Sequence, residues 1–471
     1  MKTKLLLLLL SLSMIAGIFS GCKQEEDQQT TDTTPPDVQG TILDTLPEAN
    51  LGGREFTIFG QAVEDLVFHE MQSENLDQIS YQRTAYLEEK YNVFMNAIAN
   101  DRPYDVLSND SMSGGGTFDI VKSHPTEGIA ALMTGGYCTN LLSLNNLSLS
   151  KEWYNQSAVE SYTTNDKLYL TEININYGGT LTGFVYNRDL YQQAGFTTDL
   201  YQTVYDGDWK LETFYSTVMA YSPSMDGVAD NEKSYSLVYH TGLERSFMYG
   251  IGEKTVRRNS ENEYELALSP QKLNMAADML YKLVYESENV YVGEQTYYDG
   301  WGTSDMMSIF KSGRAMFIEY DIGGLYTYLR DIEFDIGYLP MPQYDVYQTE
   351  YMSNTGGCTW FIPTTISTPE ESAVVMEAIT RYGHVYLRPA FYDEILAGRL
   401  SKKDIDVKML DLLFDSLVYD IGFTFDGAGA GPLKGVLTYV VIGKKTNTVD
   451  SFMESQELIY NAIVNQINNI E

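Results

Sequence analysis

A set of polar and aromatic residues follows or ends segments of this chain that have a strand-like pattern. In open α/β sheets, ligands bind beyond the carboxyl ends of the strands. Carboxylates and amides hydrogen-bond to hydroxyl groups, and flat aromatic rings pack on the C–H face of a sugar ring. The predicted ligand-binding set is Lys122, Ser123, His124, Glu172, Asn176, Tyr177, Trp301, Tyr320, Asp321 and Trp360.

Several members of this set also have an ordinary structural explanation. Trp360, within TWFIP, has the surroundings of a core residue, which competes with stacking on a ligand. His124 precedes a proline and could serve only to shape a turn, and Lys122 could pair with a neighbouring carboxylate. We expect Tyr320 and Asp321 to be the first ligand contacts.

Catalytic chemistry has little support in the sequence. The histidines His69, His124, His240 and His384 are scattered, and neither H-E-x-x-H nor C-x-x-C occurs. A G-x-S-x-G nucleophile elbow is also absent. A secreted glycoside hydrolase would need paired carboxylates, which 65 acidic residues always permit, but no motif places two of them together. We therefore predict no enzyme activity, no catalytic residue, no cofactor and no metal.

One acidic stretch, SPSMDGVADNEKS at residues 222–234, resembles a calcium loop. Ser222 and Ser224 stand where such a loop has acids, and Lys233 stands where the bidentate glutamate belongs. We interpret the stretch as a degenerate surface turn, and calcium binding by Asp226 and Asp230 stays open as the less favoured alternative.

The N-terminus has the features of an export signal. Lys2 and Lys4 precede an apolar run that is short for a membrane span and ends in small residues. The ending Phe-Ser-Gly-Cys resembles the lipobox of bacterial lipoproteins. This resemblance implies a signal peptide at residues 1–21 and a lipidated Cys22, which would hold the protein on the extracellular face of the cell membrane.

Composition sets the frame for the rest of the chain. Residues 22–50 begin with a polar, acidic run with little to bury, and are predicted to be a disordered tether. A net charge of −34 argues against nucleic acid and against anionic lipid surfaces as partners. About 420 residues after the tether are more than one core usually serves, so two lobes are expected. The sequence does not decide whether Cys138 and Cys358 form a disulfide.

The element pattern predicts an α/β protein. Strand-like runs at 54–60 and 117–125 alternate with helix-like runs at 79–93 and 126–137, which favours a mainly parallel sheet. Two extended runs flank Gly178-Gly179, a pair that suits either a hinge or a hairpin turn.

Three later helices have clear signals. Ser269-Pro270 and Thr368-Pro369 predict helix starts, the second with Glu371 in the capping position three residues on. The last stretch, 451–470, predicts an amphipathic helix that packs on a lobe through Phe452, Leu458, Ile459, Ile463 and Ile467.

A family resemblance comes from an ordered series of segments rather than from one motif. The series comprises FDIV with GGYCTNLLSL, GFVYNRDLYQQAGF, GDWKLETF, FKSGRAMFIEYDIG, IGYLPMP and GCTWFIPTTISTPEESAVVMEAI. In this order, from about residue 54 to 440, they resemble the extracellular solute-binding proteins of family 1, the sugar-type substrate-binding lipoproteins of ABC importers. The departures are Arg188 for the usual lysine, and Lys210 and Leu211 for a threonine and a tryptophan.

The resemblance implies an α/β, two-lobed, periplasmic-binding-protein-like clamp of type II with a hinge and an interlobe cleft. Its chain path implies lobe I at 51–176 and 353–400 and lobe II at 177–352 and 401–471, with hinges near Gly178-Gly179 and Gly356-Gly357.

The function that this resemblance implies is capture of a solute by lobe closure and delivery to ABC permease subunits. An oligosaccharide is the expected solute. A receptor for a peptide or a cationic solute such as a polyamine stays open as an alternative, because the strong negative charge would suit a cation. The charge of the cleft, rather than that of the whole chain, decides between these solutes.

Overall fold

The structure is a computed structural model of the 471-residue chain. It divides into two compact units, Met1–Pro36 and Asp37–Glu471, and all the residues that it describes belong to the second. Those residues are 40–175, 181–221, 223, 227–229, 232–240, 244–293, 304–322, 329, 332–355, 358–396, 404–426, 435–442 and 448–470. Within these ranges, no helix has the length and apolar content that crossing a membrane requires.

The first sheet has four strands in the order β14-β3-β1-β2. Its strands are β1 (Glu55–Gly60), β2 (Phe94–Ala99), β3 (Ile120–Ser123) and β14 (Thr359–Phe361). β1 pairs in parallel with β2 and β3, and β14 runs antiparallel to β3. The predicted strands at 54–60 and 117–125 are thus confirmed, and their inner residues are buried.

The second sheet has five strands in the order β10-β7-β11-β6-β12. Its strands are β6 (Thr182–Asn187), β7 (Tyr235–His240), β10 (Val290–Gly293), β11 (Ala315–Asp321) and β12 (Ile336–Leu339). β7 pairs in parallel with β10 and β11, whereas β6 lies antiparallel between β11 and β12. Each sheet falls within one of the two predicted lobes, whose exact bounds stay a prediction.

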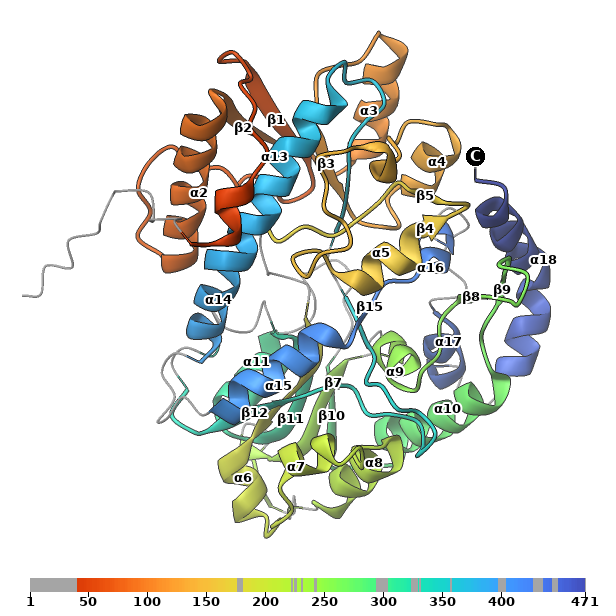
Figure 1. Ribbon diagram of the computed structural model, residues 1–471. Coiled ribbons are helices and arrows are strands. Elements are labelled where there is room, and N and C mark those ends of the chain that lie inside the picture. Colours follow the sequence, from red (N-terminus) through yellow and green to blue (C-terminus); the bar gives the residue numbers. More distant parts are fainter. Residues whose placement is uncertain are drawn as a thin grey trace, which may run out of the picture. The chain divides into compact units, whose positions relative to one another are not determined.

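Short strands and helices surround these sheets (Figure 1). The short pairs are β4 (Thr163–Thr164) with β5 (Lys167–Leu168), β8 (Val256–Arg258) with β9 (Tyr264–Leu266), and β13 (Ser353–Asn354) with β15 (Leu417–Val418). The helices are η1 (Ile42–Thr45), α2 (Asn75–Tyr91), α3 (Pro103–Met112), α4 (Ile129–Thr134), η2 (Leu141–Ser143), α5 (Gln156–Tyr162), α6 (Arg188–Gln193), α7 (Leu200–Tyr205), α8 (Leu211–Ala220), α9 (Glu244–Gly250), α10 (Pro270–Tyr285), α11 (Ser304–Lys311), α13 (Pro369–Tyr382), η4 (Gly383–Leu387), α14 (Arg388–Ile395), α15 (Asp404–Asp415), α16 (Ile421–Asp426), α17 (Val436–Ile442) and α18 (Val449–Asn468).

The predicted helix starts are correct in place but differ in chemistry. Ser269 caps α10 by accepting a hydrogen bond from the backbone of Lys272, with Pro270 as the first helical residue. Thr368 precedes α13 but makes no side-chain cap. Glu371, expected in a capping box, instead accepts a hydrogen bond from Arg54 at 3.0 Å. The expected capping box is therefore wrong, because a charge-assisted contact with a neighbouring strand takes the carboxylate.

The C-terminal helix confirms the predicted amphipathic pattern with one correction. Phe452, Ile463 and Ile467 are buried, together with Tyr460. Leu458 was expected on the packed face but is 86% exposed. Tyr460 is buried in its stead, because Tyr460 lies on the same face of the helix as Phe452 and Ile467.

The run that was expected as a strand before Gly178-Gly179 is mostly irregular. Only β5 is regular there, and Thr171 then forms a single bridge with Trp360 of β14. Thr171 and Trp360 exchange two backbone hydrogen bonds of 3.0 and 2.8 Å. This bridge holds the segment that leads out of the first sheet against that sheet. Both glycine pairs predicted as hinges lie outside the described residues.

Candidate functional site

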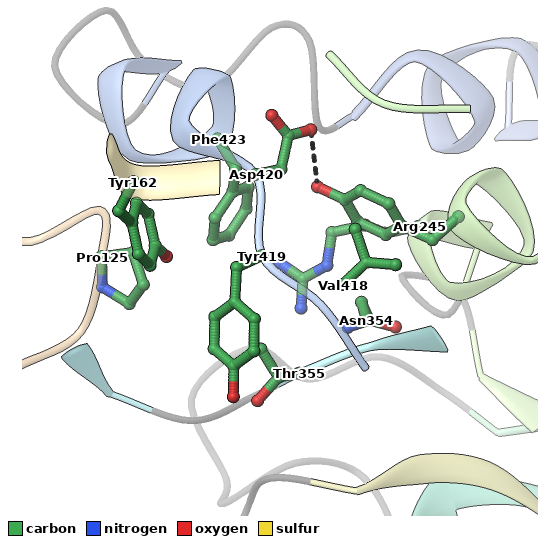
Figure 2. A pocket seen from close by; sticks show the side chains of 10 residues that line it. Pro125, Tyr162, Arg245, Asn354, Thr355, Val418, Tyr419, Asp420 and Phe423 are labelled. Atoms are coloured by element: carbon green, nitrogen blue, oxygen red, sulfur yellow. Dashed lines mark hydrogen bonds between the residues drawn. The ribbon is translucent and has the colours of Figure 1, made fainter. Parts of the chain in front are cut away.

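A pocket lies between helix α9, which follows β7 of the second sheet in the chain, and segments that surround the first sheet (Figure 2). It holds about 290 Å³ of empty space, part of it open to solvent. Its enclosed part is therefore much smaller than this figure, and a solute would enter it with a substituent at most. Its lining residues are Pro125, Tyr162, Arg245, Tyr249, Asn354, Thr355, Val418, Tyr419, Asp420 and Phe423.

Aromatic rings form much of the wall. Tyr162 and Tyr419 meet edge to face with ring centroids 5.9 Å apart, and Phe423 meets His124 in the same way at 6.1 Å. Both tyrosines are 2% exposed, so their positions are fixed by packing. Rigid rings of this kind offer flat apolar surface at little cost in conformational entropy.

Two polar side chains in the pocket have no hydrogen-bond partner among the described residues. The Arg245 guanidinium stacks on the Phe423 ring, 4.9 Å from its centroid, and makes no hydrogen bond or ion pair there. The Oδ1 atom of Asn354, a residue 5% exposed, is buried without a partner. A buried amide oxygen without a partner is costly, which makes such an atom a candidate for ligand contact.

A hydrogen bond joins the pocket to the predicted site. The Tyr419 hydroxyl donates to Oε2 of Glu172 at 3.0 Å. Burial raises the pKa of Glu172 to about 7, although the Tyr419 hydrogen bond and the charge of Lys122 oppose that rise. Glu172 is thus close to half protonated at neutral pH, and it can both accept and donate a hydrogen bond there.

Asp420 anchors the pocket from its other side. It accepts hydrogen bonds from the Thr255 backbone and hydroxyl at 2.6 and 2.7 Å, from Tyr249 at 3.2 Å and from Gly422 at 3.0 Å. Burial nevertheless raises the pKa of this carboxyl. With these bonds made to the protein, Asp420 has a positioning role and little capacity left for a ligand.

A further buried carboxyl, that of Glu319, interacts electrostatically with Arg245. Glu319 of β11 is completely buried, and its two oxygens have no partner of good hydrogen-bond geometry among the described residues. Burial raises its pKa to about 8, which nearby Ser246 and Arg245 only partly offset. Burial therefore favours the neutral form of Glu319, and no ion pair joins it to Arg245 in the described part of the chain.

Four predicted ligand residues come together near this pocket. Trp360 pairs with Lys122 across β14 and β3, and the Lys122 ammonium lies 5.8 Å from the Trp360 ring centroid. The Lys122 ammonium donates to the Ala62 carbonyl at 2.9 Å, and burial lowers its pKa. The charge of Glu172 attracts the Lys122 ammonium. Ser123, the next residue in the chain, is only 1% exposed.

Burial decides how three of these residues are placed. Trp360 is 1% exposed and Lys122 6%, so the core position weighed for Trp360 is the one it occupies. Ser123 points its hydroxyl toward the His124 carbonyl at 3.4 Å. None of these three side chains lines the described pocket, and direct ligand contact by them stays a prediction.

His124 lies in a turn, and shaping this turn is the alternative role that the sequence suggested for it. Its backbone amide donates to Gln61 at 2.6 Å, and its ring nitrogen Nδ1 pairs with the Thr126 hydroxyl at 2.8 Å. The next residue, Pro125, lines the pocket. The ring itself is half-buried against Phe423, at the margin of the pocket.

Tyr320 and Asp321 end β11 in the second sheet and are both half-buried. They pair with Gly183 and Thr182 of β6, and Asp321 accepts a long hydrogen bond, 3.4 Å, from the Leu181 amide. Neither lines the described pocket. Ligand contact by this pair stays a prediction.

The remaining predicted residues lie outside the described part of the chain. They are Cys22, Asn176, Tyr177 and Trp301. Much of the stretch at 222–234 lies outside it as well, so the structure leaves the calcium question where the sequence left it. In the described ranges no group of three or more His, Cys, Asp or Glu side chains could hold a metal ion.

The structure answers the question about the two cysteines. Cys138 and Cys358 are both free thiols, the first buried and the second half-buried. Burial raises the pKa of both. They therefore do not cross-link the segments in which they lie.

Most of the pocket was missed by sequence reasoning. Arg245, Asn354, Tyr419 and Phe423 follow no strand that the pattern predicted, and they come from three distant segments. Asn354 stands two residues before the predicted hinge glycines, and that proximity was the one signal available.

Comparisons with known proteins place this fold. No family model and no curated relative matches the sequence. Among solved structures, it is similar to the ABC substrate-binding protein of Listeria monocytogenes in complex with cycloalternan, with 14% identity, a TM-score of 0.56, and coverage of 88% of this chain and 99% of the other. The GacH receptor of Streptomyces glaucescens, studied with acarbose, has 12% identity, a TM-score of 0.58 and the same coverage.

A third similar structure, UgpB from Mycobacterium tuberculosis in complex with glycerophosphocholine, has 16% identity and a TM-score of 0.56. Coverage is 87% of this chain and 98% of that one. The first two of these neighbours are described as a substrate-binding protein and a receptor. The chain has the mixed α/β, two-lobed fold of the periplasmic-binding-protein-like solute-binding proteins.

Proposed function

We propose that this protein is the lipid-anchored extracellular substrate-binding protein of an ABC importer, which captures an oligosaccharide by lobe closure and presents it to the permease. The observation that carries the proposal is the pocket of Figure 2, with rings and polar groups contributed from both sides. Pro125 and Tyr162 come from the predicted lobe I, and Arg245 and Tyr249 come from the predicted lobe II.

The composition of the pocket supports a saccharide. Edges of the Tyr162, Tyr419 and Phe423 rings line the pocket and suit the C–H surface of a sugar, and the free amide of Asn354 suits a hydroxyl. A solute that touches both lobes stabilises their closed arrangement, because its contacts are complete only there.

The charge of the pocket weighs against the cationic alternative. Arg245 points into it without an ionic partner among the described residues, while the pKa values of Glu172, Glu319 and Asp420 are all raised. A polyamine would meet this guanidinium before it met an ionised carboxylate. The large negative charge of the whole chain therefore does not extend to this pocket.

A thermal-shift screen of residues 40–471 tests the proposal. The panel contains neutral and acidic oligosaccharides, short peptides, spermidine and putrescine. A ligand at 100 times its dissociation constant adds about 2.7 kcal/mol to the stability of the native state. Stabilisation by a saccharide is expected, and stabilisation only by a peptide or a polyamine would contradict the saccharide assignment.

The proposed anchor has a separate test. Expressed in a bacterium with lipoprotein processing, the full chain is expected to incorporate labelled palmitate and to fractionate with the membrane. Cys22→Ser is expected to abolish the label and to release the protein into the medium, because only the thiol carries the lipid. A Cys358→Ser variant is the matched control and is expected to keep the label.

A further inference from the structure

The arginine in the pocket differs from the other described arginines. All of them except Arg245 and the exposed Arg102 donate at least one side-chain hydrogen bond within the described part of the chain. Arg245 is half-buried and stacks on Phe423, and its guanidinium makes no hydrogen bond or ion pair with the described residues. A half-buried guanidinium without an acceptor is costly, since its donors have lost part of their water.

The contact with Phe423 leaves the donors of Arg245 available. Its guanidinium lies over the ring, 4.9 Å from the centroid. In such stacking the face of the guanidinium meets the ring, while its N–H groups project from the edge in the plane. Figure 2 shows the Arg245 head group among Tyr419, Phe423 and Asn354. The stacking thus fixes the plane in which an acceptor must lie.

A second unpartnered group lines the same pocket. The Asn354 side chain is held by β13, which pairs with β15, and its Oδ1 atom is buried without a partner. Which atom of this amide is oxygen and which nitrogen follows from the hydrogen bonds that it makes. The amide NH₂ group could donate a hydrogen bond to an acceptor atom of a ligand, and the amide oxygen could accept one from a ligand hydroxyl.

Three carboxyls around the pocket do not form an ion pair with Arg245. Glu319 is the one that acts on it most directly, and burial raises its pKa to about 8. Asp420 uses its oxygens on Thr255, Tyr249 and Gly422. Glu172 accepts from Tyr419 and also faces Lys122. No carboxylate in the described part of the chain makes an ion pair with Arg245, so an anion entering the pocket would meet its positive charge.

We propose that Arg245 and Asn354 form a subsite for a carboxylate group of the solute, so that the captured oligosaccharide contains a uronate. This inference rests on the proposed saccharide-binding function and narrows it. The edge of a guanidinium carries two parallel N–H donors that match the two oxygens of a planar carboxylate. The adjacent Tyr162 and Tyr419 rings would contact the sugar ring that carries this group.

The test compares matched acidic and neutral ligands on residues 40–471. The acidic probes are uronate trisaccharides from pectin, alginate and glucuronoxylan, each measured beside its carboxyl-reduced form. Maltotriose and maltotetraose serve as neutral probes, and a sulfated trisaccharide tests whether another anion is preferred. Isothermal titration gives the dissociation constants. At least one uronate probe is expected to bind more tightly than its reduced form.

Two variants connect that preference to the pocket. Arg245→Met keeps an apolar stem on Phe423 but removes the donors, and it is expected to weaken uronate binding roughly 10- to 150-fold. Asn354→Asp keeps the size of the side chain and adds a negative charge, so it should also abolish the preference for the acidic form. Arg257→Met, at an exposed ion pair on β8, is the matched control. Circular dichroism and urea unfolding check that each variant is folded.

The outcomes separate this inference from the proposed function. If neutral or sulfated saccharides bind and uronates do not, the carboxylate subsite is refuted and the saccharide receptor remains. Uronate binding that Arg245→Met and Asn354→Asp leave unchanged would also refute the subsite. If no saccharide of any class binds, the proposed function itself fails, and the inference fails with it.

Discussion

Glu319 gives the most direct test of the electrostatics around the pocket. It shares one face of β11 with Phe317, which packs against Phe184 of β6 and Phe214 of α8. Its carboxyl is completely buried, and desolvation raises its pKa from 4.5 to about 8. We predict that Glu319→Gln stabilises the protein increasingly as the pH rises, because glutamine has the same size and cannot ionise.

The sign and size of this effect follow from proton linkage. A carboxyl whose pKa is raised by folding holds its proton more tightly in the native state, so its stability contribution is complete below pH 4.5. That contribution is lost as the pH rises through the folded pKa. With pKa values of 4.5 unfolded and about 8 folded, the loss between pH 5 and pH 8 is on the order of 3 to 4 kcal/mol. The advantage of Glu319→Gln over the natural chain should grow by that amount.

Urea unfolding of residues 40–471 at four pH values between 5 and 8 measures the difference. Tryptophan fluorescence and circular dichroism are followed together, because two lobes that unfold separately would give transitions that do not coincide. Glu454→Gln is the control, since Glu454 is exposed on α18 and should give a difference that does not vary with pH. A Glu319→Gln advantage that stays constant across this range would show that Glu319 is ionised or solvated in the native state, and the reasoning would be refuted.

The other predictions test buried contacts in each part of the fold. Arg188→Met should cost about 3 to 5 kcal/mol in urea unfolding, because it leaves the completely buried Asp406 carboxylate without its 2.7 Å partner; Arg257→Met, at an exposed ion pair, should cost less than about 1 kcal/mol. Gly383→Ala should prevent stable folding, since the added carbon would lie 1.6 Å from the Asn174 carbonyl oxygen, whereas Gly435→Ala meets no atom within 4 Å and should give a normal circular-dichroism spectrum. Alkylation of residues 40–471 in denaturant without reductant should label both Cys138 and Cys358 by mass spectrometry, and an unlabelled pair would reveal a disulfide.

Local patterns were sufficient to predict most of the regular elements. The alternation at 54–60 gave β1, and the serine-proline start gave α10, because both depend on residues close together in the chain. The wrong predictions concern residues whose contacts depend on parts of the chain far away in sequence. Glu371 pairs with Arg54, 317 residues away, instead of capping its own helix. Leu458 has the spacing of a packed residue, yet its side chain lies on the exposed face of α18.

The candidate site was only partly predictable for the same reason. Residues that follow a strand, such as Lys122 and His124, could be located from the strand itself. The pocket also needs Arg245 from a short helix and Tyr419 directly after a two-residue strand, and neither has a periodicity that marks it. Their proximity depends on the pairing of β13 with β15, which joins residues more than 60 positions apart.

The segment 416–420 explains how a solute in this pocket could act on both sides of it. Val418 pairs with Asn354, Tyr419 donates its hydroxyl to Glu172 of the segment beside the first sheet, and Asp420 binds Thr255 beside α9. Three consecutive residues are thus fastened to three different parts of the fold, and all three line the pocket. A ligand that packs on Tyr419 and binds Arg245 would add a fourth connection across the same few residues. Because differential contact is the only means by which a ligand can shift a conformational equilibrium, this segment is where binding energy would favour one arrangement of the lobes over another.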